Sequence, residues 1–500
     1  MATLPVIGDE AYYFYWAMHP AGGYYDLPPM VGWWLIPFVK VSLSPLWLRL
    51  PNLLVMSLIS FGIYECLTPV MEKKRAGKIA CLFLFLPFPF LSIFMFPDVP
   101  LLFFSFFSSL LFFLALQQKE KASWVTFLFS GSLWGAAFLS KYFAVLLIPV
   151  FGIFLLWKHR RAWPGLILFG LGALPFIFQH LHWNARHCWA NFVFNLITRQ
   201  KSQDGSVFQT TGYYLLYLVI LSSPFLWGAF DSRLRINLKQ EWKRLDGFRD
   251  FQDYALLLWL IPVLSFGSSA LMGKGQGLHW LLFVLPFFTI WAGCRLGDSE
   301  LRRALRDLMA FTGGLTLFAV LTLAFPGKIL APFFEHRFHF EYSLATHPEE
   351  FVETVLKDVK STPLAFTEGY TFSSILNYEM QKYAKAHHIT LPEVSVWGSG
   401  SRFGRVFDWS TDFKVLDGKK LIIITPGFLI KEKWTAYFNT IVVETRTFEG
   451  QNFYVTTGEG FKASEYLHSE FRKPVEGYYP KFLPAICSLR DITGLGAYGN

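Results

Sequence analysis

The sequence GDEAYYFYWAM at residues 8–18, followed by YYDLPP at residues 24–29, places three carboxylates among aromatic rings. Tyrosine and tryptophan favour the membrane–water interface, so we expect Ala11 to Met18 to form a short helix at a lipid surface. Acids held at such a surface suggest chemistry. The alternative is that Asp9 only caps the helix start, as acids near a helix N-terminus often do, and the spacing favours neither role.

The composition around this stretch indicates a polytopic membrane protein. Of the 500 residues, 53% are hydrophobic, 19% aromatic and only 16% charged, which is too apolar for a soluble enzyme. The formal net charge of +9 lies largely at helix ends, so we expect no nucleic-acid partner. The cysteines define no disulfide framework, because Cys66, Cys81 and Cys294 fall in or beside apolar segments. Only Cys188 and Cys487 could share an oxidising compartment.

Apolar runs of about 16 to 20 residues, the length of a bilayer core, predict ten transmembrane helices. They lie at residues 52–68, 79–96, 99–117, 122–140, 142–157, 163–181, 211–230, 254–272, 278–294 and 307–326. Alternate connections are rich in lysine and arginine, which places them in the cytoplasm by the positive-inside rule. The polar groups then expected on the outer side are Asp9, Glu10, Asp26, Asp98, Lys141, the loop 182–210, Lys274 and everything after Pro326.

Two further segments complete the expected architecture. Residues 30–43 are short for a span and predict an interfacial or re-entrant helix. From Gly327 the composition changes, and we expect an outward-facing soluble α/β domain at 327–500 beside a membrane-embedded domain at 1–326. Its predicted elements are strands at 421–425, 440–443 and 452–456 and an amphipathic helix at 373–386. Because no span precedes Asp9, either a short uncharged tail crosses directly or a first helix lies upstream.

Asp98 and Lys141 are the charged residues most out of place in this apolar setting. Asp98 lies in the turn FPDVP between two apolar runs, where a carboxylate without a partner costs several kcal/mol, so intramembrane acids are usually functional. Its alternative role is to cap the helix that starts at Val99. Lys141 either snorkels to the interface or, with Arg186 and Lys274, forms a cationic cradle for a phosphate in an apolar groove.

The run HLHWNARH at residues 180–187 is dense in imidazole but matches no strong metal-ligand motif. We therefore assign no residues as metal ligands, while a divalent cation remains possible as a cofactor. The chain also carries no Walker motif, no dinucleotide fingerprint after a strand and no nucleophile elbow, so a soluble nucleotide in a cytoplasmic pocket is not expected. Weaker candidates for substrate contacts are Tyr25, Asp26, His182, His279 and Arg402.

Taken in order, these motifs resemble those of bacterial GT-C glycosyltransferases, in the branch related to protein O-mannosyltransferases and lipid A aminoarabinose transferases. The matching stretches are Asp9 to Tyr13, Tyr24 to Pro29, Arg49-Leu50-Pro51, Pro97 to Pro100, Leu139 to Tyr142, Trp183 to His187 and His279-Trp280. The match covers most of residues 8–295. The C-terminal part resembles the family only in place and size, with 402–409 as a candidate substrate-binding stretch.

The resemblance implies a mannosyltransferase-like enzyme of the cell envelope. It would take a sugar from a polyprenyl-phosphate carrier at the outer face of the cytoplasmic membrane and pass it to a lipid, glycan or protein. Asp9 matches the family's principal catalytic acid, with Glu10 beside it, and Asp98 matches the acid of the second outer loop. Lys141 stands where the family keeps a lysine for the carrier phosphate, and Asp26 where it keeps a polar group before paired prolines. Leu27 departs from the pattern, because relatives often have Lys or His there.

The chemistry of such a transfer fits these assignments. A sugar on a lipid phosphate has a good leaving group, so the enzyme needs a base for the acceptor, here Asp9, and cations for the phosphate, here Lys141 and Arg186. An inverting single displacement would follow. The rival function is ion-coupled transport of a small solute, but secondary transporters place charges near the midplane and usually show repeated halves, whereas these acids gather at one rim. A mere anchor for the C-terminal domain would need neither acids nor lysines there.

Overall fold

The computed structural model describes residues 6–87, 94–118, 120–187, 189–199, 205–227, 246–324, 344, 347–355, 364–367, 369–397, 405–426, 434–448 and 450–469. The chain divides into two compact units. The first comprises Met1–Leu48, Trp183–Ile197 and Thr322–Asn500, and the second comprises Arg49–His182 and Thr198–Leu321. Asp9 and Asp26 therefore fall in the same unit as the C-terminal residues. The functional division expected at residue 326 stays a prediction.

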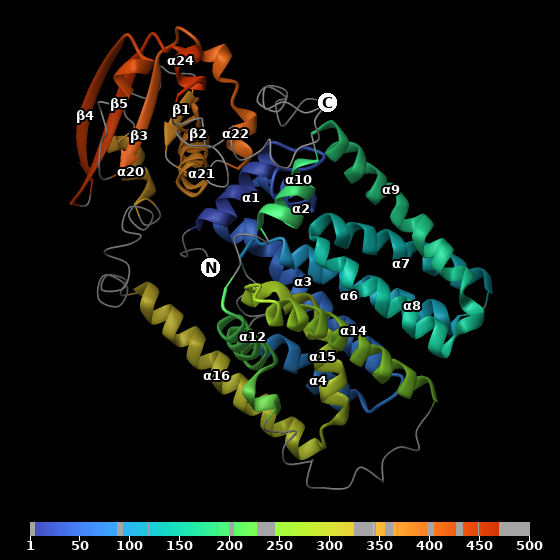
Figure 1. Ribbon diagram of the computed structural model, residues 1–500. Coiled ribbons are helices and arrows are strands. Elements are labelled where there is room, and N and C mark those ends of the chain that lie inside the picture. The colour runs from blue at the N-terminus through green and yellow to red at the C-terminus, as the bar shows by residue number, and fades with distance from the viewer. Residues whose placement is uncertain are drawn as a thin grey trace. The chain divides into compact units, whose positions relative to one another are not determined.

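The second unit is helical in its described residues (Figure 1). Its elements are α3 (Pro45–Leu67), α4 (Lys73–Phe85), α6 (Asp98–Gln117), α7 (Glu120–Ser140), η1 (Tyr142–Leu146), α8 (Leu147–Lys158), η2 (Arg160–Ala162), α9 (Pro164–Arg186), α12 (Val207–Ser222), α14 (Asp246–Leu271), η4 (Leu278–Val284), α15 (Leu285–Arg295) and α16 (Asp298–Ala324). The ends of α3, α9 and α16 extend into the first unit.

Six stretches of the described residues are long and apolar enough to cross a membrane. They are Pro45–Leu67, Asp98–Gln117, Lys121–Ser140, Pro164–Arg186, Arg249–Leu271 and Leu278–Arg295. Shorter apolar helices lie at Met30–Val41, Tyr142–Lys158 and Val207–Ser222. The expected class, a mainly helical polytopic membrane protein with a small α/β domain, is confirmed. The number of ten spans stays a prediction.

One expected span begins and ends differently. We predicted it at 79–96, but α4 begins at Lys73 and ends at Phe85. The residue after Phe85 is Leu86, which precedes Pro87 and has extended backbone angles, φ −60° and ψ 142°. A proline disfavours the α conformation in the residue before it, so the sequence stops the helix at this point. Residues 88–93 of the expected span lie outside the described residues.

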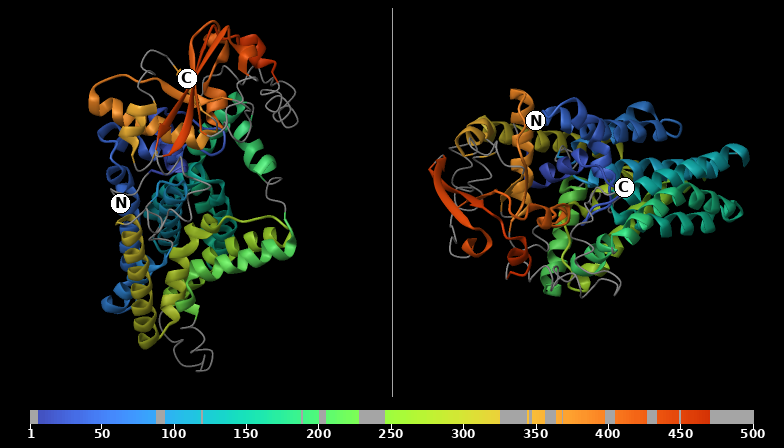
Figure 2. Two further views of the ribbon diagram at one scale, coloured as in Figure 1. Left: turned by 90° about the vertical axis from the view of Figure 1, so that its left-hand side faces the viewer. Right: turned by 90° about the horizontal axis from the view of Figure 1, so that it is seen from above.

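Close packing of α6 on α7 and of α7 on α9 determines where two candidate residues lie. The hydroxyls of Ser108 and Ser130 each donate to the other's backbone carbonyl, both over 2.8 Å. A Cβ at Gly131 of α7 would lie 1.8 Å from the Phe169 carbonyl oxygen of α9, so only glycine permits this approach. Helices α6 and α7 lie side by side in Figure 1, and Figure 2 gives two further views of the chain. Asp98 begins α6 and Lys141 directly follows α7.

The first unit joins N-terminal helices to a small sheet. Its elements in the described residues are α1 (Gly8–Met18), α2 (Met30–Val41), α10 (Ala190–Val193), η3 (Phe194–Thr198), α20 (Pro348–Val355), β1 (Leu364–Thr367), α21 (Tyr370–His387), β2 (Glu393–Val396), α22 (Val406–Ser410), η7 (Phe413–Leu416), β3 (Leu421–Pro426), η8 (Thr435–Tyr437), β4 (Thr440–Phe448), β5 (Gln451–Glu459) and α24 (Ala463–Leu467). The last residue of η3 belongs to the second unit. The predicted helix at 373–386 and the three predicted strands correspond to α21, β3, β4 and β5.

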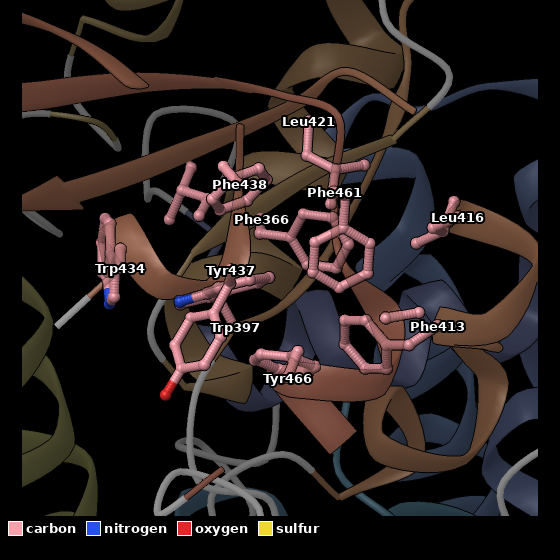
Figure 3. Packing of buried hydrophobic residues seen from close by; sticks show 12 residues of the cluster. Phe366, Trp397, Phe413, Leu416, Leu421, Trp434, Tyr437, Phe438, Phe461 and Tyr466 are labelled. Carbon is pink, nitrogen blue, oxygen red and sulfur yellow. The ribbon is translucent and has the colours of Figure 1, made fainter. Parts of the chain in front are cut away.

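Strands in the described residues form one sheet in the order β2-β1-β3-β5-β4. The pairs β1–β2 and β1–β3 are parallel, while β3–β5 and β4–β5 are antiparallel. Aromatic rings cover part of the sheet, and Figure 3 shows Trp397 among them. Its ring stacks on Tyr466, with centroids 4.3 Å apart, and lies 5.8 Å from Phe438. This buried cluster gives the sheet a core of its own.

Helix α1 packs on α21, which connects the N-terminal acids to the α/β part of the same unit. The rings of Phe14 and Tyr378 meet edge to face at 4.9 Å. The Tyr378 hydroxyl donates to the Leu43 carbonyl over 2.6 Å, just beyond α2. The segment quoted first is therefore a buried part of this unit, with Tyr12, Phe14 and Trp16 at most 1% exposed.

Candidate active site

The start of α1 separates the roles of the two neighbouring acids. The helix is capped at Ile7, and the Glu10 carboxylate accepts the Ile7 backbone N–H over 3.3 Å. Through this hydrogen bond Glu10, which is fully buried, performs the local capping that we considered for Asp9. A Cβ at Gly8 would lie 2.1 Å from the Thr371 methyl group, so glycine is what allows α1 to approach the start of α21.

The Asp9 carboxylate is directed toward α21 instead. Its Oδ1 accepts a hydrogen bond from the Tyr370 hydroxyl over 3.0 Å and lies 4.0 Å from Nη1 of Arg405. The side chain is 46% exposed, so a small molecule can reach it. Asp9 is therefore an oriented carboxylate that remains partly open to solvent.

Asp26 lies near the same arginine as Asp9, but its side chain is far less exposed to solvent. Its Oδ1 accepts from the Tyr12 hydroxyl over 3.0 Å, and its Oδ2 forms an ion pair with Arg405 Nη1 over 2.9 Å. The side chain is only 4% exposed. Burial raises the pKa of Asp26, while the Arg405 guanidinium and the Tyr12 hydrogen bond oppose that shift. We call Asp9, Tyr12, Asp26, Tyr370 and Arg405 the loop-acid cluster.

Side-chain amides hold the turn that carries Asp26. Asn191 donates to the Tyr24 carbonyl over 2.6 Å, and Asn195 donates to the Asp26 carbonyl over 2.9 Å. Tyr25 packs on Phe194 with centroids 4.9 Å apart and is 2% exposed. As substrate contacts, both Tyr25 and Asp26 stay predictions, since the structure shows them engaged within the protein.

A second charged group lies in the second unit. Lys141 Nζ donates to Asp98 Oδ1 over 2.8 Å, and the two side chains are 5% and 4% exposed. His279 Nε2 lies 3.9 Å from Asp98 Oδ2 and is 49% exposed, so it forms the open side of the group. Lys141 Nζ also lies 5.0 Å above the Phe143 ring. We call Asp98, Lys141 and His279 the buried-pair group.

This geometry decides between the local roles considered for Asp98 and Lys141. The N-cap of α6 is Pro97 with no side-chain cap bond, so Asp98 is not the capping residue. Lys141 does not snorkel, because its ammonium ends on a buried carboxylate. The Lys141 ammonium and the Asp98 carboxylate neutralise each other, as buried charges in apolar surroundings require.

The remaining candidates are Arg186, Lys274, His182 and Arg402. Arg186 is exposed at the end of α9 in the first unit, whereas Lys274 lies in the second, so the phosphate cradle with Lys141 stays a prediction. His182 is exposed and stacks on Phe178 at 6.1 Å. Arg402 lies outside the described residues.

The histidine-rich run serves local structure where it is described. His180 Nε2 is 2.6 Å from the Tyr142 hydroxyl, and His187 stacks on Trp183 at 4.1 Å. The searched part of the chain contains no group of three or more His, Cys, Asp or Glu arranged to hold a metal ion.

Two arginines near these groups escaped the sequence analysis. Arg405 joins the loop-acid cluster, and Arg199 lies 5.3 Å from the ring of Trp280, the residue after His279. The candidate stretch 402–409 included Arg405, but its pattern favoured Arg402. Arg199 had no signal beyond its place in an expected outer loop.

Comparisons with known proteins agree with the fold and motifs. Residues 26–183 match the family described as dolichyl-phosphate-mannose-protein mannosyltransferase. The lipid A galacturonosyltransferase RgtD of Rhizobium johnstonii is 28% identical over 184 residues, which is 36% of this chain and 38% of that protein. The alignment thus spans well under half of this curated relative.

Solved structures extend the likeness over most of the chain. The crystal structure of ArnT from Cupriavidus metallidurans in the apo state has a TM-score of 0.57 at 14% identity and covers 91% of this chain and 94% of its own. The structure bound to undecaprenyl phosphate also scores 0.57, at 13% identity, and covers 91% of this chain and 95% of its own. At this identity the likeness concerns the fold.

Proposed function

The chain resembles GT-C, PMT-like glycosyltransferases in motifs, family match and fold, and from this premise we propose that it is a polyprenyl-phosphate-sugar-dependent glycosyltransferase. It would transfer the sugar to a lipid, glycan or protein acceptor at the outer face of the cytoplasmic membrane. The observation that carries the proposal is the oriented and partly exposed carboxylate of Asp9. The relative crystallised with undecaprenyl phosphate supports the carrier class.

In this proposal Asp9 is the general base. The acceptor hydroxyl or phosphate gives its proton to Asp9 and attacks the anomeric carbon, while the bond from that carbon to the carrier phosphate breaks. The sugar inverts in a single displacement and the polyprenyl phosphate leaves. The Tyr370 hydroxyl fixes the direction of the carboxylate, which matters because a base must lie within hydrogen-bond reach of the proton that it takes.

The buried-pair group would meet the carrier phosphate. An ammonium has three N–H donors, and the bond to Asp98 uses one of those on Lys141. Because Asp98 neutralises much of that charge, the phosphate needs further cations, and we assign Arg186 and Lys274 to this role. Asp98 would orient Lys141, and His279 would border the opening.

Turnover of a defined donor tests the proposal. Purified protein in detergent is given a panel of polyprenyl-phosphate sugars with candidate acceptors, and released polyprenyl phosphate is measured. Asp9→Asn should lower the rate about 10²- to 10⁴-fold, the usual cost of losing a general base. Glu465→Gln, which removes an exposed acid in α24, is the matched control and should keep full activity. Retained turnover in Asp9→Asn would show that Asp9 is not the base.

A further inference from the structure

We infer that Arg405 is a positioning residue for Asp9, so that the C-terminal part of the chain completes the proposed catalytic site. The inference rests on the proposed function and adds to it a residue that the sequence motifs did not single out. Arg405 precedes α22, nearly four hundred residues after Asp9, and both lie in the first unit.

The guanidinium of Arg405 is held on several sides. Its carbon lies 3.7 Å from the ring centre of Tyr370 and 5.5 Å from that of Tyr12, so the two rings flank the cation. Nη1 binds Asp26 over 2.9 Å and stands 4.0 Å from Asp9. The same two tyrosines donate their hydroxyls to the two acids, which ties ring, cation and carboxylate into one network.

The backbone at Arg405 independently indicates a constrained site. Arg405 has φ +50°, in the region that residues with a side chain rarely adopt. The next residue, Val406, donates its backbone N–H to the Tyr12 hydroxyl over 3.2 Å, which anchors the segment to α1. Such conformations persist only where surrounding contacts hold them, and they concentrate at functional sites.

The different exposures of Asp26 and Asp9 indicate different roles for the two acids in the loop-acid cluster. Asp26 is nearly inaccessible and serves as the fixed counter-ion that orients Arg405. Asp9 is the accessible acid, and Arg405 faces it at 4.0 Å. Without Arg405, the Asp26 carboxylate would stay buried without its counter-ion, and Asp9 would lose the cation beside it.

The titratable groups that face Asp9 come from several elements of the first unit. Tyr12 and Tyr13 come from its own helix, Tyr370 comes from α21, and Asp26 and Arg405 complete the surroundings, with Glu10 adjacent in the chain. Burial raises the pKa of Tyr370 to about 12 and raises the pKa values of Tyr12 and Tyr13 well above their ordinary value, so these hydroxyls keep the protons that they donate.

The test is the split between kcat and KM in Arg405→Gln, with Arg405→Lys beside it. Because Arg405 acts through the direction of the Asp9 carboxylate, its loss should lower kcat about 10- to 100-fold and leave the KM for the donor nearly unchanged. Arg405→Lys keeps a positive charge, so it should recover part of the lost kcat although the planar fork is lost. Arg446→Gln is the matched control, because it removes an arginine paired with Glu444 in β4, and its kcat and KM should equal those of the wild type.

A purely structural role predicts a different result. Arg405→Gln would then reduce the fraction of folded protein while kcat per folded molecule stays that of the wild type, and this result overturns the inference. Where Arg405→Gln does not fold, Arg405→Lys carries the test, and a kcat equal to that of the wild type overturns the inference there too. Tyr370→Phe removes only the hydroxyl that donates to Asp9 and should lower kcat in the same way.

Thermal unfolding without substrate separates this inference from the proposed function. Arg405→Gln leaves the Asp26 carboxylate buried without its partner, so the unfolding temperature should fall at pH 7.5 and the deficit should shrink toward pH 5 as that carboxyl takes up a proton. A deficit that is constant with pH would refute the charge network. If the wild type turns over no donor while the pH-dependent deficit appears, the proposed function fails and the network stands.

Discussion

The pairing of Lys141 with Asp98 predicts a large loss of stability when either partner is removed alone. Both side chains are about 5% exposed and their atoms are 2.8 Å apart. Removal of one partner of a buried ion pair costs about 3–5 kcal/mol, because the other charge stays buried and uncompensated. Lys141→Ala should therefore lower the free energy of unfolding by about that amount. His279 lies 3.9 Å from Asp98 on the open side and replaces little of the lost contact.

The assay is equilibrium unfolding in detergent for a double-mutant cycle of Lys141→Met, Asp98→Asn and the two together. The double variant leaves no buried charge, so it should be more stable than the sum of the single losses predicts, with a coupling of about 1–3 kcal/mol. Lys158→Ala is the matched control, since Lys158 pairs with Asp250 and Asp253 at 3.0 Å but is 24% exposed. An exposed lysine pair is worth about 1 kcal/mol or less.

Single variants that unfold like the wild type would refute this reasoning. The lysine would then have a free ammonium in the unliganded protein, and loss of donor binding in Lys141→Ala could be attributed directly to the phosphate. If the predicted loss is found, donor affinity must be compared between Lys141→Ala and Asp98→Asn at temperatures where both remain folded. A direct phosphate contact then appears as weaker binding in Lys141→Ala than in Asp98→Asn.

Two further predictions concern the C-terminal part. Burial raises the pKa of Glu379 to about 7 from its ordinary 4.5, so ionisation of this carboxyl destabilises the fold fully above pH 7 and not below about pH 4.5. Glu379→Gln should therefore raise the free energy of unfolding at pH 8 by about 2–4 kcal/mol and leave it nearly unchanged at pH 4.5. Thermal unfolding at the two pH values measures the difference. We also predict that an alkaline phosphatase fused after Asn500 is active, because the lysine and arginine bias of the loops predicts that the C-terminal part lies outside the cytoplasm. Activity only with a cytoplasmic reporter would reverse that predicted topology.

Local sequence patterns predicted the helices and strands that are long enough to show a pattern of their own. The apolar runs identified the long helices, and short strand-like segments identified β3, β4 and β5. The four-residue strands β1 and β2 were missed because segments of this length carry too little pattern, and their parallel pairing depends on residues far along the chain. The count of spans was harder, since helices such as α12, with 16 residues, lie near the length at which hydropathy stops being decisive.

The candidate site shows a similar limit. The sequence identified Asp98 and Lys141 separately, and the rule that an intramembrane acid needs a partner implied that one existed. It did not identify the partner, because 43 residues separate the two and only the packing of α6 on α7 brings them together. Charge alone predicted a cradle that contains Lys141, which stays a prediction, and gave no sign that Lys141 is paired with Asp98.

Arg405 shows why an important residue can carry no signal. It lies in GSGSRFGR, where Arg402 and Arg405 are chemically equivalent to a reader of the sequence. Only the sheet and α21 place Arg405 against α1, where Asp26 gives it a counter-ion and Asp9 lies within 4.0 Å. The exposed carboxylate of Asp9 is thus contacted by residues from the opposite end of the chain. A motif confined to the N-terminal half contains the proposed proton acceptor, and the C-terminal part supplies the side chains that hold it.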